Sequence, residues 1–171
     1  MQLIRCTGKL QKEMGLKKTE LIEEEGSDSK LGSWHANLIH INGRKCILFV
    51  NDKTLLNFIV TDVTRAEIRG LSEMFLNTLI CVLADEGVSN SVIDAIKQEY
   101  SENGYAKTNN KSVLGSMNDL AFHYKFLIQD SGGVHSHMVP SIIKQLNHMP
   151  MGAINYAYSI DAFRAIYEAK H

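Results

Sequence analysis

WHANLIHINGRKCILFVN occupies residues 34–51 and consists of two β-rich runs separated by Asn42-Gly43. Asn-Gly is the dipeptide that best tolerates the positive φ angles of a type I′ turn, so it predicts a hairpin of strands 34–41 and 44–51. A third run, 54–60, follows a polar turn, and residues 1–6 are expected to add another strand. The N-terminal part therefore predicts an antiparallel meander of three or four strands.

After residue 63 the apolar residues recur at helical spacing. Thr64 and Glu67 have the spacing of a capping box, and Gly70 is expected to interrupt the first turns. Glycine is also expected to end the next two helices, at Gly87 and at Asn103-Gly104. The remaining helices are expected at residues 8–14, 112–129, 139–148 and 159–169. Strands followed by about five C-terminal helices predict an α+β fold, with a strand-rich part (1–62) and a helical part (64–171) in one domain (1–171).

The composition narrows the class of protein. A chain of 171 residues with 44% hydrophobic residues is typical of one globular domain. The longest apolar runs are too short for a membrane span, and the first residues lack a secretory signal, so we expect a cytoplasmic protein with no membrane partner. A net charge of −1 does not favour nucleic-acid binding. Cys6, Cys46 and Cys81 are widely separated among apolar neighbours, which predicts three reduced, buried thiols.

No metal or nucleotide motif is present in the sequence. His135 and His137 could supply half of a metal site, but the spacing provides no third ligand, and a solvated loop explains them better. Gly132-Gly133 lacks the spacing of a phosphate-binding loop. We therefore expect neither a metal nor a cofactor.

The helix expected at 112–129 carries Ser112, Ser116, Asp119 and His123 on one face. A catalytic triad is excluded within this helix, because Ser116 and His123 lie about 10 Å apart along its axis, with the acid between them. What remains is an Asp119–His123 pair one turn apart, which would be either a structural hydrogen bond or a catalytic base. His35 is the third candidate for acid-base chemistry.

Two polar regions are candidates for ligand binding. Lys107 and Lys111 flank the start of the same helix, where cations are unfavourable unless an anion or solvent screens them, and both explanations stay open. In a meander, the start of the first hairpin strand and the turn after the second lie at the same end of the sheet. The candidate ligand-binding residues from these regions and from the helix face are Trp34, Asn37, Asn51, Lys53, Thr54, Lys111, Ser112 and Ser116.

Several segments together resemble a known family. These are Ile4-Arg5-Cys6-Thr7, residues 31–38 (LGSWHANL), residues 48–54 (LFVNDKT) and residues 112–120 (SVLGSMNDL). They resemble a family of small, uncharacterised bacterial proteins that is classed as a domain of unknown function. The resemblance spans nearly the whole chain and implies a single domain; it implies no activity, although such domains often travel on mobile elements.

Two classes of function stay open. The favoured one is a non-catalytic binding or accessory module for a small anionic ligand or a protein partner. The alternative is a small hydrolase or a nucleic-acid-directed, toxin-like enzyme that uses His/Asp acid-base chemistry. A sheet edge at 54–60 could pair with a second copy in a homo-oligomer or could equally be covered by a helix.

Overall fold

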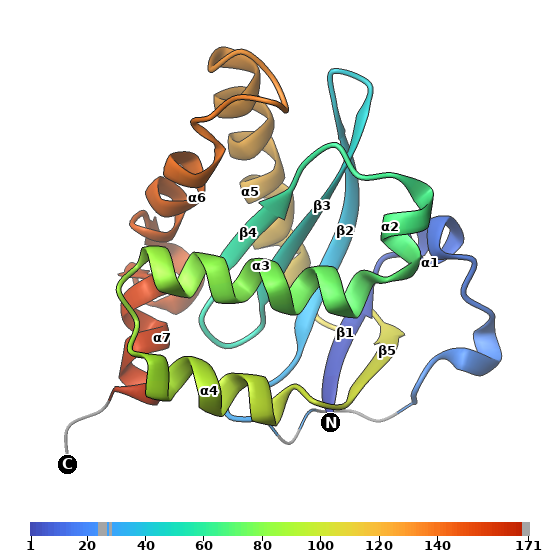
Figure 1. Cartoon of the computed structure of the whole chain (residues 1–171), viewed down its shortest axis with the longest axis horizontal. Helices are drawn as coiled ribbons and strands as arrows, with labels where there is room; N and C mark the ends of the chain where they lie inside the picture. The colour runs from blue at the N-terminus through green and yellow to red at the C-terminus, as the bar shows by residue number, and fades with distance from the viewer. Residues whose placement is uncertain (24–26, 28, 169–171) are drawn as a thin grey trace.

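The computed structural model describes residues 1–23, 27 and 29–168 as an α+β structure built around a five-stranded mixed sheet (Figure 1). The strands are β1 (Gln2–Cys6), β2 (Trp34–Ile41), β3 (Arg44–Asn51), β4 (Asn57–Val60) and β5 (Asn103–Lys107), in the order β4-β3-β2-β1-β5. The helices are α1 (Gly8–Met14), α2 (Arg65–Arg69), α3 (Leu71–Asp85), α4 (Asn90–Glu99), α5 (Lys111–Asp130), α6 (Val139–Asn147) and α7 (Ser159–Tyr167). Two 3-10 turns, Lys18–Glu20 and Gly152–Ile154, and a small sheet of β6 (Pro150–Met151) and β7 (Ala157–Tyr158) complete the described elements.

The expected hairpin is confirmed. Asn42 and Gly43 have φ angles of 51° and 75°, and Ile41 lies opposite Arg44 across a two-residue turn. Strand β4 then pairs antiparallel with β3, so β2, β3 and β4 form the expected meander. The Asn42-Gly43 turn is of type I′, which requires residues that tolerate positive φ and matches the twist of the two hairpin strands.

The other two strands correct the sequence-based expectation. β1 pairs with β2 in parallel rather than antiparallel, and β5 pairs in parallel with β1. A parallel pair needs a long crossover, which residues 7–33 and the helices after β4 provide. Strand β5 also contradicts the expectation that 64–171 is helical and that Asn103-Gly104 only ends a helix. Gly104 lies within the strand, packed against Leu3 and Ile22, where a Cβ would come within 2.1 Å of Ile22.

The sheet separates two layers of helices (Figure 1). On the face covered by α3 and α4, the rings of Phe49 and Phe58 pack with those of Trp34 and Phe75, and the Trp34 and Phe75 centroids are 5.1 Å apart. Trp34 Nε1 donates a hydrogen bond of 3.0 Å to the hydroxyl of Tyr100. Helix α5 lies on the opposite face, along β2 and β3, while α6 packs beside the edge strand β4.

The expected helices form with small shifts of their ends. The Thr64–Glu67 capping box is present, with both reciprocal hydrogen bonds, and Gly70 separates α2 from α3. Helix α7 begins at Ser159 as expected, whereas Ala169, its expected end, lies outside the described residues. No helix in the described part of the chain is long and apolar enough to cross a membrane.

One of the three cysteines is not in the core. Cys6 and Cys46 are buried, but Cys81 is exposed. Helix α3 fully buries one stripe of its surface, which includes Phe75 and Leu79. Cys81 lies outside that stripe, which gives the protein one accessible thiol among the described cysteines.

Candidate functional site

The end of the sheet that carries Trp34 and Asn51 is organised by the Asn51 side chain. The two residues lie directly opposite each other, as the meander predicts. Asn51 Oδ1 accepts hydrogen bonds from the backbone amides of Lys53 and Thr54 and from the Thr54 hydroxyl, at 3.2, 3.0 and 2.8 Å. Its Nδ2 donates to Leu31 O at 2.9 Å. Asn51 and Thr54, both buried, thus hold the turn in shape.

The neighbouring candidates also make contacts within the protein. Trp34 is fully buried, and its indole N–H is satisfied by Tyr100. Asn37 accepts a hydrogen bond from the Thr7 hydroxyl at 2.8 Å, and Lys53 Nζ donates to Lys30 O at 2.9 Å. At this sheet end, Trp34, Asn37 and Lys53 thus each bond to another part of the protein.

His35 lies on the other face of β2, because successive strand residues point to opposite faces. Its Nδ1 is 2.6 Å from Asp52 Oδ1, and its Nε2 accepts a long hydrogen bond of 3.5 Å from the backbone amide of Asn109. A backbone amide can only donate, so this geometry corresponds to the tautomer with the hydrogen on Nδ1. The ring is fully buried. His35 therefore anchors the segment before α5 to the sheet.

Arg5 holds the same segment from the adjacent strand. It lies beside His35 in the parallel register of β1 and β2, is 4% exposed, and donates from Nη1 to Lys107 O at 3.0 Å. Because Lys107 ends β5 and Asn109 precedes α5, both anchors act on the chain where it leaves the sheet. The backbone of this segment is thus fixed at two points.

A polar cavity of about 620 Å³ opens beside this segment, and we call it the basic pocket. Its lining comes from β1, from the chain after α1 and from the end of β5. The lining residues are Arg5, Lys18, Leu21, Ile22, Glu23, Lys107, Thr108 and Asn109. Ile22 is attached to β5 through its backbone amide, which donates to Tyr105 O at 2.8 Å. Three cationic side chains thus face one carboxylate among the described lining residues.

The start of α5 lies next to this pocket. Asn110 caps the helix by accepting a hydrogen bond from the Val113 amide at 3.1 Å. Lys111 and Ser112 follow on the exposed first turn and do not line the pocket. The cations that the structure gathers here are Arg5 and Lys18 together with Lys107. Sequence reasoning missed Arg5 and Lys18 because nothing local links residues so far from the helix to its start.

Ser116, Asp119 and His123 lie together on the outer side of α5. They line a separate surface pocket of about 430 Å³, whose opposite wall is formed by residues 149–153. Within the described residues, no hydrogen bond or ion pair joins Asp119 to His123, although the two share a helix face. His35 lies inside the fold, so the three acid-base candidates do not form one site.

Among the described residues, no group of three or more His, Cys, Asp or Glu side chains is arranged to hold a metal ion. His135 Nε2 instead lies 3.1 Å from Asp62 Oδ2.

Comparison with known proteins adds a family but no activity. Residues 3–162 match the model of a family described as Domain of unknown function (DUF6933). The chain belongs to this family. Searches of curated proteins and of solved structures gave no match.

Proposed function

We propose that this protein is a non-catalytic binding module for a small anionic ligand, held in the basic pocket. The observation that carries the proposal is the convergence of Arg5, Lys18 and Lys107, from three separate segments, on one cavity. A cavity in which cations outnumber carboxylates, as three to one among the described lining residues here, concentrates anionic ligands. Its volume of about 620 Å³ lies within the range of small-molecule sites.

The remaining lining residues narrow the chemistry of the ligand. The Thr108 hydroxyl and the Asn109 side-chain amide can donate hydrogen bonds to phosphate or carboxylate oxygens. Leu21 and Ile22 form an apolar wall. These features fit a molecule with a phosphate or carboxylate head group and a less polar remainder.

The anchored backbone favours binding over catalysis. Arg5 and His35 hold residues 107–109 in place, so this wall is ordered before a ligand arrives and little entropy is lost on binding. Among the described lining residues, none is a nucleophile paired with a general base. The pocket is therefore suited to recognising an anion rather than to transforming it.

The test uses isothermal titration with inorganic phosphate and with pyrophosphate at constant ionic strength. Lys18→Ala and Lys107→Ala are each expected to weaken binding about two- to fivefold, the usual size of one partly exposed charge contact. Lys97→Ala removes the same charge from the exposed surface of α4 and serves as the matched control. Equal effects of all three variants, or no binding of either anion at millimolar concentration, would mean that solvent alone screens these cations.

The enzymatic alternative, a small hydrolase or toxin-like nuclease, is favoured only by the shared pocket of Ser116, Asp119 and His123. It has less support, because no described residue makes a hydrogen bond that prepares His123 as a base, and because His35 is buried. Release of product from RNA or from a simple ester, lost in His123→Ala but retained in the exposed-surface variant Lys97→Ala, would reverse this ranking.

A further inference from the structure

Strand β4 is one of the two edge strands of the sheet, and its backbone groups point alternately toward β3 and away from it. The Asn51 amide donates to Leu56 O, so by the antiparallel pattern the backbone groups of Phe58 and Val60 also face β3. The N–H and C=O groups of Asn57 and Ile59 therefore point away from the sheet.

The outward-facing backbone groups of Asn57 have hydrogen-bond partners, whereas those of Ile59 have none among the described residues. Asn147 satisfies Asn57: its Oδ1 accepts from the Asn57 amide at 2.9 Å, and its Nδ2 donates to Asn57 O at 2.7 Å. The backbone N–H and C=O of Ile59 have no hydrogen-bond partner within residues 1–23, 27 and 29–168. Ile59 is only 2% exposed, and such buried backbone groups are almost always paired. One backbone donor and one backbone acceptor at this position of the edge therefore have no partner in the described part of the protein.

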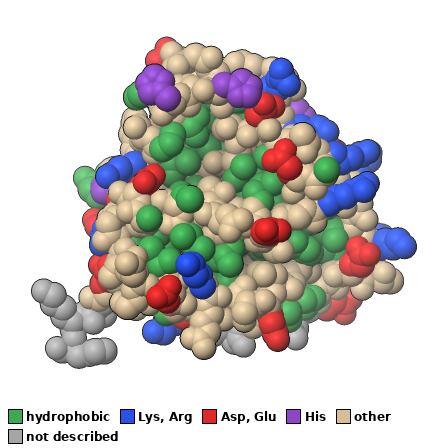
Figure 2. All heavy atoms as spheres, viewed as in Figure 1, with side chains coloured by type: hydrophobic (Ala, Val, Ile, Leu, Met, Phe, Trp, Pro, Cys, Tyr) green, Lys and Arg blue, Asp and Glu red, His purple; other side chains and the backbone are tan. Residues whose placement is uncertain are grey.

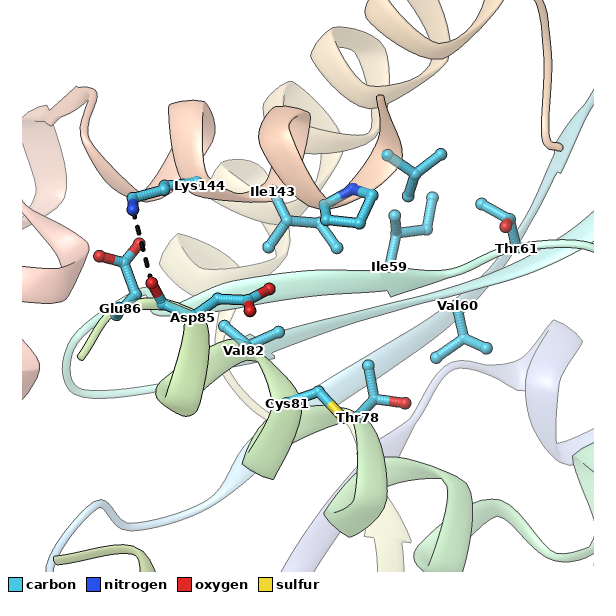
Figure 3. Close-up of a pocket in the computed structure, with 12 residues that line it drawn as sticks. Ile59, Val60, Thr61, Thr78, Cys81, Val82, Asp85, Glu86, Ile143 and Lys144 are labelled. Carbon is cyan, nitrogen blue, oxygen red and sulfur yellow. Dashed lines mark hydrogen bonds between the residues drawn. The ribbon is translucent and has the colours of Figure 1, made fainter. Parts of the chain in front are cut away.

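An apolar groove of about 280 Å³ lies against this position (Figure 3). Its floor is formed by residues 59–61, one wall by α3 and the other by α6, and Figure 3 shows Val82 and Ile143 on opposite sides of it. In the space-filling view, apolar side chains gather in the hollow between α6 and α3 (Figure 2). Because both walls are apolar, side chains that alternate in direction along an extended strand would each meet an apolar surface.

The end of the groove near the last turn of α3 is acidic. Asp85 and Glu86 line it together with one cation, Lys144, whose Nζ donates to the backbone oxygen of Asp85. Glu86 is paired with His148 at 3.0 Å, whereas Asp85 has no ion pair among the described residues. A partner that carries a basic side chain at this end would complement Asp85.

We infer that this groove binds an extended peptide segment of a partner protein, which adds to β4 by pairing with Ile59. The segment carries apolar residues between the helices and a Lys or Arg beside Asp85. Added strands of this kind gain affinity from backbone hydrogen bonds and specificity from side-chain pockets. The edge of a second copy's sheet is disfavoured, because α3 and α6 line both sides of the groove at β4 and would meet the rest of that sheet. The groove lies at the opposite edge of the sheet from the basic pocket, so the two proposals stand or fall separately.

The probe is an end-blocked pentapeptide with three central valines and a lysine at each end, which offers a basic group in either strand direction. Cys81 lines the groove and is exposed, whereas Cys6 and Cys46 are buried, so its reaction with Ellman's reagent reports occupancy. Saturating peptide is expected to slow this reaction at least about fivefold, and to slow hydrogen exchange of the Ile59 amide as it gains a partner.

Two controls separate strand pairing from simple apolar contact. The same peptide with all three valines N-methylated keeps its side chains but loses its donors, and is expected to bind about tenfold more weakly. Thr78→Trp should block the groove, because Thr78 lines it. Asn77→Trp should not block it, because Asn77, the preceding residue, is exposed and does not line the groove. Equal protection of Cys81 by both peptides, or none at millimolar concentration, overturns the inference.

Charge reversal provides a test that does not depend on filling the groove. Asp85 is exposed, so Asp85→Lys should leave the fold intact. It is expected to weaken the lysine peptide about two- to fivefold and to strengthen a peptide with glutamate at both ends by a similar factor. An Asp85→Lys protein that binds both peptides as the original does would show that Asp85 takes no part in recognition.

Discussion

Replacement of Asn147 by alanine is expected to destabilise the protein by about 4 kcal/mol, because this side chain satisfies both outward-facing backbone groups of Asn57. Both residues are fully buried, so water does not replace the lost hydrogen bonds without opening the structure. Asn147 also lies at the end of α6 and donates to Ile143 O at 3.0 Å, which ties the helix to the edge strand.

The magnitude follows from counting the groups that lose their partner. Asn147→Ala leaves one amide and one carbonyl of Asn57 unpaired, and each costs about 1–3 kcal/mol when buried. Tyr124→Phe removes only the hydroxyl that donates to Asn57 Oδ1 at 2.6 Å, so we expect about 1–3 kcal/mol in total. Because the two variants share Asn57, their effects should not add in the double variant.

Urea unfolding followed by circular dichroism measures these differences, provided that the slope of free energy against urea stays constant. Gln129→Ala is the control: it removes an exposed hydrogen bond to Asn42 and should change stability by less than about 0.5 kcal/mol. If Asn147→Ala costs no more than this control, Asn57 is satisfied in another way and the account of the β4 edge is wrong.

Two further predictions concern pH and the anchored segment before α5. Burial raises the pKa of Tyr100 and of Tyr124 above the ordinary value of 10.0, so above pH 10 only the unfolded chain ionises readily at these positions. The two tyrosines therefore stabilise the fold fully below pH 10. Above pH 10 the free energy of unfolding should fall by about 1.4 kcal/mol per pH unit for each tyrosine. Urea titrations from pH 9 to 11.5, alongside absorbance at 295 nm, measure this fall, and a flat profile would contradict their burial. Asp52→Ala removes the hydrogen-bond partner of the His35 ring. It should speed hydrogen exchange of the Asn109 amide, which donates to that ring, and weaken pyrophosphate binding. Unchanged exchange would show that the position of the His35 ring does not depend on Asp52.

Local chemistry made much of the fold predictable. Asn42-Gly43 specifies its turn through backbone conformations that few other dipeptides adopt, and the hairpin formed as expected. The Thr64–Glu67 capping box and the break at Gly70 depend on groups at most six residues apart. Helix α5 was expected at 112–129 from its apolar period and spans Lys111–Asp130.

Strand β5 shows why the remainder was not predictable. Its five residues contain one glycine and no β-branched residue, so its own preference for a strand is weak. It becomes a strand because β1 offers an unpaired edge at the place where the chain arrives after α4. Such pairing is a property of chain segments about 100 residues apart and leaves no periodic pattern in either one.

The sequence alone determined the hairpin, the helix positions and the shared helix face of Ser116, Asp119 and His123, because turn chemistry and side-chain period act over a few residues. Only the tertiary structure decided which cationic side chains line the basic pocket. Arg5 and Lys18 join Lys107 because β5 pairs with β1. The backbone groups of Ile59 have no partner among the described residues because the Asn147 side chain covers Asn57 and not Ile59. Both outcomes depend on contacts between distant segments, whose pairing is selected by the packing of the whole sheet.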